Sequence, residues 1–185
     1  MASSTKDRLT VTAARLFQEK GFNGVGLTEI LTATGVPKGS LYHHFPGGKP
    51  DLALEAAELA HRETLRIIDD AFGSAADFEA GAATLFYKLA KLFDLMGKTA
   101  GCPISQILFD GAEDATFRTA TARYFETWMA TIAAHAERLG VDGAVADAQA
   151  KRLFLTLQGA WTLARATGRS DTLREVPALL FAAPR

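Results

Sequence analysis

Hydrophobic residues recur every three or four positions along most of the chain, which is the spacing of one face of an α-helix. Leu9, Ala13 and Phe17 share such a face near the N-terminus, and Ser4 with Asp7 three residues later forms a pair like a capping box at its start. Glycine and proline interrupt this pattern and divide the chain into separate helices. We expect helices at residues 4–20, 28–34, 38–44, 50–72, 77–96, 115–139, 144–167 and 171–182, with a short apolar segment at 104–109.

The segment 28–45 predicts two short helices joined by a tight turn, and it reads TEILTATGVPKGSLYHHF. Thr28 is the expected N-cap of the first helix, and Gly35-Val36-Pro37 is the turn. Two short helices joined by a three-residue turn that contains glycine are typical of a helix-turn-helix. The small core that fixes their crossing angle is expected from Ile30, Leu31, Ala33, Val36 and Leu41.

The second short helix combines an apolar side with a face rich in hydrogen-bond donors. Leu41 and Phe45 are expected in the core. Gly39 removes side-chain bulk near the start of the helix, so a DNA backbone could approach amides that suit phosphate oxygens. One of the two adjacent histidines could instead pack against the helix expected at residues 4–20. The donors are Lys38, Ser40, Tyr42, His43 and His44.

These motifs give the chain a resemblance to the TetR family of repressors over about residues 8–55. The residues that carry it are Leu16-Phe17, Gly21-Phe22, Thr28, Gly35-Val36 and Lys38-Gly39-Ser40-Leu41-Tyr42-His43-His44-Phe45. Pro46-Gly47-Gly48-Lys49 and Gly101-Cys102-Pro103 are similar to the LmrA/YxaF-type branch. The resemblance implies that Lys49 reaches a phosphate and that the DNA surface includes Thr28, Lys38, Tyr42, His43 and His44.

The expected fold class is therefore all-α, in two domains. Residues 1–48 form a three-helix helix-turn-helix DNA-binding domain, and residues 49–185 form a helical ligand-binding and dimerisation domain. The resemblance implies that the second domain encloses a cavity for a small-molecule inducer, which its rings suggest is apolar or aromatic. An ordinary core would explain the same side chains. The candidates are Phe86, Phe93, Met96, Ile107, Phe125, Trp128, Met129, Phe154, Gln158 and Trp161.

The helix expected at residues 144–167 is too apolar to lie on the surface of a monomer, and Gly159 would allow another helix to approach closely. Burial inside the protomer and burial in a homodimer both explain it. The resemblance implies that the last two long helices form a dimer. A palindromic DNA operator requires a two-fold dimer with its reading helices about 34–36 Å apart. We expect a ligand to shift the helix at 50–72 and so to lower operator affinity.

Charge and cysteine content refine this interpretation. The 185 residues have a formal net charge of −1, but residues 1–50 have six cations and three acids. A basic head on an acidic body suits local phosphate binding, although a few surplus lysines also occur on any solvated face. The single cysteine, Cys102, excludes an intrachain disulfide. With no apolar leader and no stretch long enough to cross a bilayer, we expect a cytoplasmic protein and no membrane partner.

Two other classes of protein fit the sequence less well. An enzyme is not supported, because Gly48-Lys49 fails as a phosphate-binding loop and no nucleophile elbow or metal motif is present. No cofactor is expected, and His61 and His135 are expected to be isolated at the surface. Cys102 beside Pro103 could be a redox sensor, but a lone cysteine is more often a small buried hydrophobe, which is what we expect here. A helical scaffold would not explain the Lys-Gly-Ser-x-Tyr sequence after the turn. The operator, the inducer, the regulated genes and the choice between repression and activation are not set by the sequence.

Overall fold

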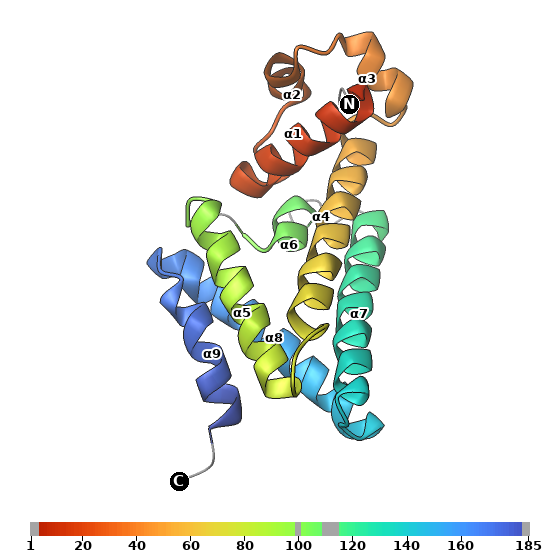
Figure 1. The fold of residues 1–185 in the computed structure, drawn as a ribbon. Helices are drawn as coiled ribbons and strands as arrows, with labels where there is room; N and C mark the ends of the chain where they lie inside the picture. Colours follow the sequence, from red (N-terminus) through yellow and green to blue (C-terminus); the bar gives the residue numbers. More distant parts are fainter. Residues whose placement is uncertain (1–3, 99–100, 109–114, 183–185) are drawn as a thin grey trace. The chain divides into compact units, whose positions relative to one another are not determined.

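The computed structural model describes residues 4–98, 101–108 and 115–182, and every regular element within these ranges is helical (Figure 1). The all-α class is thereby confirmed. The helices are α1 (Thr5–Lys20), α2 (Leu27–Thr34), α3 (Lys38–His44), α4 (Lys49–Phe72), α5 (Phe78–Leu95), α6 (Pro103–Leu108), α7 (Ala115–Arg138), α8 (Gly143–Thr167) and α9 (Asp171–Phe181).

Local sequence signals set most of the helix ends. The Asp7 amide donates to Ser4 Oγ at 3.0 Å and the Ser4 amide donates to Asp7 Oδ2 at 3.2 Å, so the capping box predicted for α1 is confirmed. The prediction that Thr28 caps α2 is wrong. Gly26 has extended backbone angles and is the N-cap, which places Thr28 inside the first turn without a capping role.

The described residues form two compact units. The first contains the described residues of 1–62 and 102–123, and the second contains those of 63–101 and 124–185. Because α4 and α7 are continuous helices, each contributes residues to both units. The division of function between residues 1–48 and 49–185 stays a prediction.

The first unit is built around α1, which packs against α2, α3 and α6. Most of the core predicted for the helix-turn-helix is confirmed, but Leu31 is only half-buried and Ala33 is exposed. Thr34 takes the buried place instead, since its hydroxyl donates to the Ile30 carbonyl at 2.8 Å and so satisfies its polar atom. The Arg8 guanidinium donates to the Thr34 carbonyl and ties the end of α2 to α1. The large, fully buried side chains of this unit are Leu9, Phe17, Ile30, Leu41, Leu52, Ile104, Ile107 and Phe117.

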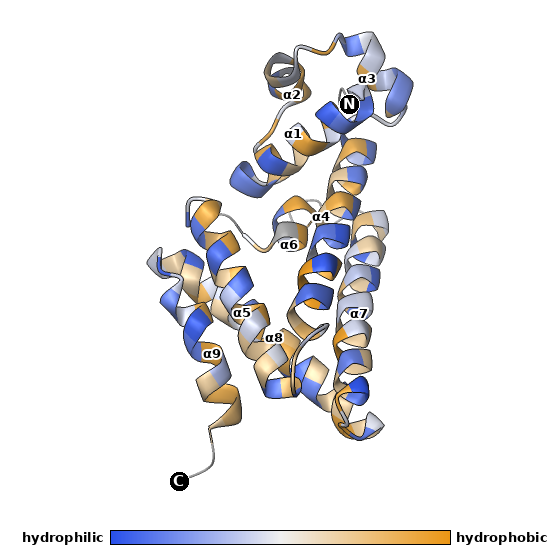
Figure 2. Ribbon diagram, in the orientation of Figure 1, coloured by the Kyte–Doolittle hydropathy of each residue, from blue (hydrophilic) through white to orange (hydrophobic). Residues whose placement is uncertain are grey.

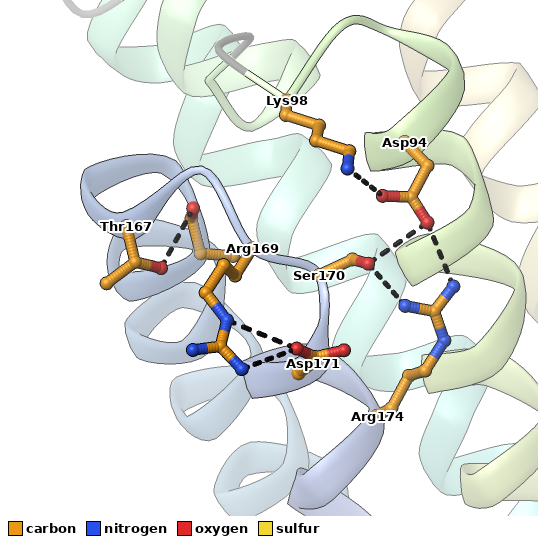
Figure 3. Close-up of polar contacts among 8 residues, drawn as sticks. Asp94, Lys98, Thr167, Arg169, Ser170, Asp171 and Arg174 are labelled. Carbon is orange, nitrogen blue, oxygen red and sulfur yellow. Dashed lines mark hydrogen bonds and ion pairs between the residues drawn. The ribbon is translucent and has the colours of Figure 1, made fainter.

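In the second unit, α9 packs against both α5 and α8. The N-terminal part of α9 is mostly polar and its C-terminal part is mostly apolar (Figure 2), and Leu173 and Val176 are its buried residues. Figure 3 shows how a polar cluster attaches α9 to the C-terminal end of α5. Asp94 Oδ2 accepts from Ser170 Oγ at 3.0 Å and from Arg174 Nη2 at 2.9 Å. The hydrogen bonds from Arg174 and Ser170 lower the pKa of Asp94 below its usual value.

Two histidines expected at the surface are not there. His61 is 9% exposed, because it lies one turn after Ala57 on the buried side of α4, and burial lowers its pKa. His135 is half-buried on α7, where its Nε2 lies 2.9 Å from Asp69 Oδ1. Its ring stacks on Phe72 with centroids 5.6 Å apart. The prediction that both histidines are isolated at the surface is therefore wrong, because each lies on a side of its helix that packs against other residues.

Candidate nucleic-acid interface

The turn between α2 and α3 has the backbone geometry that its residues predict. Gly35 ends α2 in the left-handed conformation with φ of 64°, and its amide donates to the Leu31 carbonyl at 2.9 Å. Pro37 precedes α3 with φ of −60°, within the range that its ring imposes. The Val36 side chain between them is buried and anchors the turn. The backbone geometry of Gly35 and Pro37 and the buried side chain of Val36 therefore define the turn between the two short helices.

α3 has one buried and one exposed side. Leu41 is 0% and Phe45 is 3% exposed, which confirms their predicted place in the core. His43 and His44 are both exposed, so the alternative that one of them packs against α1 is wrong. Of the remaining predicted DNA-binding residues, Thr28, Lys38, Gly39 and Tyr42 are exposed, whereas Ser40 and Lys49 are half-buried.

Tyr42 is held in place by the turn that follows α3. Gly48 has φ of 73°, and a Cβ added there would lie 3.3 Å from Tyr42 Cε1. The phenol ring therefore lies against the glycine backbone, and Lys38 Nζ lies 5.9 Å from the centre of the same ring. Gly48 consequently serves both the left-handed turn and the orientation of the tyrosine.

Lys49 begins α4 beside the same turn. Its Nζ lies 4.2 Å from the centre of the Phe22 ring, and burial lowers its pKa. Two other lysines of this unit form ion pairs: Lys20 Nζ lies 2.5 Å from Glu29 Oε1, and Lys6 Nζ lies 3.1 Å from Glu55 Oε1. Lys6 and Lys20 are therefore each paired with a carboxylate, whereas Lys49 lies against an aromatic ring.

The residues predicted to bind an inducer are distributed over both units. In the second unit, Phe125 contacts Phe154 with ring centroids 5.0 Å apart, and Trp128 lies 6.3 Å from the same phenylalanine. Phe93 and Trp161 form a separate edge-to-face pair at 5.7 Å. Phe86 is fully buried in this unit, and Met96, Met129 and Gln158 are half-buried. Ile107 is fully buried in the first unit.

A groove that the sequence did not predict lies in the second unit, along α4 and α7. Its volume is about 510 Å³, and it shares no residue with the predicted ligand set. Arg138 Nη2, at one end, donates to the Phe72 carbonyl at 2.7 Å. Sequence spacing gave no signal, because Asp69 and His135 meet only through packing of two distant helices. The lining residues are Asp69, Thr127, Ala130, Thr131, Ala134, His135 and Arg138.

Two negative findings apply to the part of the chain that the structure describes. No three His, Cys, Asp or Glu side chains in it are grouped so as to hold a metal ion. No helix in it combines the length and the hydrophobicity required to span a membrane.

The fold and the α2–α3 geometry define a helix-turn-helix DNA-binding protein, and comparison with known proteins identifies its family. Residues 9–56 match the model for bacterial regulatory proteins of the tetR family. Residues 80–178 match the C-terminal domain of LmrA/YxaF-like transcriptional regulators. The chain belongs to the TetR family and is a transcriptional regulator rather than an enzyme.

Individual relatives agree with this assignment. The HTH-type transcriptional regulator YxaF of Bacillus subtilis (strain 168) is 32% identical over 130 residues, which cover 70% of this chain and 68% of YxaF. A regulatory protein TetR from Rhodobacter sphaeroides has a crystal structure that superposes with a TM-score of 0.80 at 30% identity, covering 94% of this chain and 95% of that one. A TetR regulator from Legionella pneumophila, at 21% identity and a TM-score of 0.83 over 97% and 96% of the two chains, shows the same fold.

Proposed function

We propose that this regulator is a repressor that binds a palindromic operator as a homodimer and is released by a small apolar or aromatic inducer. The observation that carries the proposal is the two-sided α3, with Leu41 and Phe45 buried and Lys38, Tyr42 and His43 exposed. A short helix anchored by its apolar side can present its polar side to the major groove, as the second helix of a helix-turn-helix does.

Each residue predicted to bind DNA has a role in this proposal. Lys38 and Lys49 neutralise phosphates and contribute affinity that is independent of sequence. Ser40 and Tyr42 donate to phosphate oxygens or base edges, and His43 and His44 face the acceptors of the major groove. Thr28 and the backbone at Gly39 lie at the starts of α2 and α3, where amides without intrahelical partners suit phosphate.

The proposed dimer uses α8 and α9. Leu155 and Leu163 on α8 are 60% and 57% exposed, and Leu179 on α9 is 76% exposed. Gly159 lies between the two α8 leucines, and a Cβ added there would meet nothing within 4 Å. Large exposed apolar side chains in such a series favour contact with a second copy.

The proposed inducer site lies among the aromatic side chains of the second unit. The ring contacts of Phe93 with Trp161 and of Phe125 with Phe154 supply apolar and aromatic surface. Met96, Met129 and Gln158 add two adaptable thioethers and one amide that orients a ligand. A thermal-shift screen of small aromatic compounds, followed by an operator-release assay, tests this part. Compounds that stabilise the protein but leave operator binding unchanged would contradict an inducer role.

Binding to the DNA that flanks the protein's own gene tests the main proposal. We expect a gel shift that is abolished or strongly weakened in Lys38→Ala and Tyr42→Ala. Lys91→Ala, an exposed lysine of α5 in the second unit, is the matched control and retains binding. A purified protein that is monomeric and does not bind these fragments, even at low salt, would refute the proposal.

A further inference from the structure

Phe22 lies in the segment after α1 and contacts the side chain of Lys49. The proposed function gives Lys49 a role but gives none to this contact. The Lys49 ammonium lies 4.2 Å from the centre of its ring, well inside the range of a cation–π interaction. Two other lysine–ring contacts of this unit are longer, at 5.9 Å for Lys38 with Tyr42 and 6.0 Å for Lys6 with Phe45.

The Phe22 ring is itself held in place by two buried rings. Its centroid lies 5.8 Å from that of Phe17, which is 0% exposed. It lies 5.1 Å from that of Phe117 at an interplanar angle of 88°, and Phe117 is 2% exposed. The ring is therefore a fixed platform on the buried core, and the flexible Lys49 side chain loses conformational freedom when it lies on it.

An aromatic partner differs from a carboxylate in a way that matters for binding an anion. Lys6 and Lys20 lie beside Glu55 and Glu29, so a phosphate would have to compete with a negative charge for either ammonium. The Phe22 ring is neutral and leaves the full positive charge of Lys49 available on the side away from the ring.

We propose that Phe22 is a positioning residue for DNA binding, whose ring holds the Lys49 ammonium in advance in the place from which it contacts a backbone phosphate. This inference deepens the proposed function and rests on it. Burial of the Lys49 ammonium, which lowers its pKa, supports it, because a partly desolvated charge gains more from an anionic partner.

A double-mutant cycle tests this role with a random-sequence DNA duplex at low salt, because a phosphate contact does not depend on base sequence. Phe22→Leu, which keeps an apolar side chain but removes the ring, should weaken binding about two- to tenfold, and Phe22→Tyr should restore it. In a Lys49→Met background the Phe22→Leu change should have no further effect. Lys49→Met should also lower the salt slope of log K by about 0.9 for each phosphate that the lysine neutralises in the wild type.

A spectroscopic readout separates positioning from a structural role. The Lys49 ε-CH₂ protons should show an upfield ring-current shift in the wild type and in Phe22→Tyr, and should not show it in Phe22→Leu. If the losses of binding free energy in Phe22→Leu and Lys49→Met are additive, the inference is overturned although the protein still binds DNA. Absence of the ring-current shift in the wild type would overturn it too. If Phe22→Leu does not fold, the wild-type shift and the affinity of Phe22→Tyr decide. A wild type that does not bind the duplex refutes the proposed function as well.

Discussion

Two glycines near α3 illustrate how single residues connect the fold to the proposed interface. Gly39 lies on the exposed side of the helix, and an added Cβ would meet nothing within 4 Å. Gly48 has φ of 73°, where an L side chain is strained, and an added Cβ would lie 3.3 Å from Tyr42. Packing within the protomer thus does not require a glycine at position 39, and only a molecule outside the protomer would use the open space there. At position 48 the backbone conformation and the Tyr42 ring of the protomer itself require a glycine.

Gly39→Ala is expected to leave the protein as stable as the wild type, or up to about 1 kcal/mol more stable because alanine favours the helix. Operator affinity is expected to fall, since the methyl group would occupy the space proposed for the DNA backbone. Thermal unfolding and fluorescence anisotropy measure the two effects. Gly48→Ala is the contrasting variant and should lose about 1–2 kcal/mol of stability. Undiminished affinity in Gly39→Ala would show that the duplex does not approach here.

At the scale of elements, short side-chain clusters hold helices that are far apart in sequence. The cluster of Asp94, Ser170 and Arg174 joins the end of α5 to the start of α9 (Figure 3). A carboxylate that accepts hydrogen bonds from a guanidinium and a hydroxyl is stabilised in its charged form, which is why the pKa of Asp94 is lowered. The polar part of the attachment of α9 therefore depends on the ionised state of one carboxyl group, whereas the packing of α9 against α5 and α8 does not.

The stability that Asp94 contributes is expected to depend on pH. Because its pKa in the folded protein lies below the ordinary value of 3.8, the contribution is fully present above that value and disappears as pH falls through the lowered pKa. Asp94→Asn should therefore lower the Tm at neutral pH, and the difference from the wild type should shrink in strong acid. Glu175→Gln, at an exposed position of α9, is the control. A difference in Tm that is constant across pH would contradict this account.

The exposed side of α8 gives a second prediction at this scale. Gly159→Ala is expected to preserve or slightly increase the stability of the protomer, because the position is helical and open. If α8 helices approach closely in the proposed dimer, the added methyl group should shift the equilibrium towards monomer. Light scattering across a dilution series measures this. Leu163→Lys should disrupt the dimer more strongly, whereas Lys91→Ala, at an exposed position of α5, should not.

At the scale of the whole molecule, the chain has two compact units, and two of its segments match two domain models of the TetR family. The match to the tetR-family model covers residues 9–56, and α6 belongs to the same compact unit as α1–α3. The match to the LmrA/YxaF-like domain covers residues 80–178. DNA binding and dimer formation are therefore proposed for different parts of the chain, and a two-fold dimer would set the spacing of the DNA contacts.

The spacing of the operator half-sites is expected to follow from that symmetry. Two α3 helices in successive major grooves require half-sites about 10–10.5 bp apart. An insertion of about 5 bp at the centre of the palindrome would place the half-sites on opposite faces of the duplex and should abolish tight binding. Footprinting on the native and the altered operators measures the effect. Equal affinity for both would argue for independent binding by single protomers.

Much of the fold was predictable because its signals are local. The periodicity of α1 and the Ser4–Asp7 cap depend on neighbours within one helical turn, and both are confirmed. The anchoring of α3 by Leu41 and Phe45 was predictable for the same reason, since Leu41 belongs to this short helix and Phe45 is its C-cap. The start of α2 differs from the prediction, because Gly26 rather than Thr28 has the extended backbone angles of the N-cap.

The sequence by itself determined the all-α class, the helix-turn-helix and the polar side of α3, because each is specified by residues within a few positions of one another. Only the tertiary structure decided that His61 is buried, that His135 pairs with Asp69 and that Lys49 lies on Phe22. These features need side chains from separate helices to meet. Spacing along one chain does not specify which surfaces of two helices come into contact, since that depends on how the whole core packs.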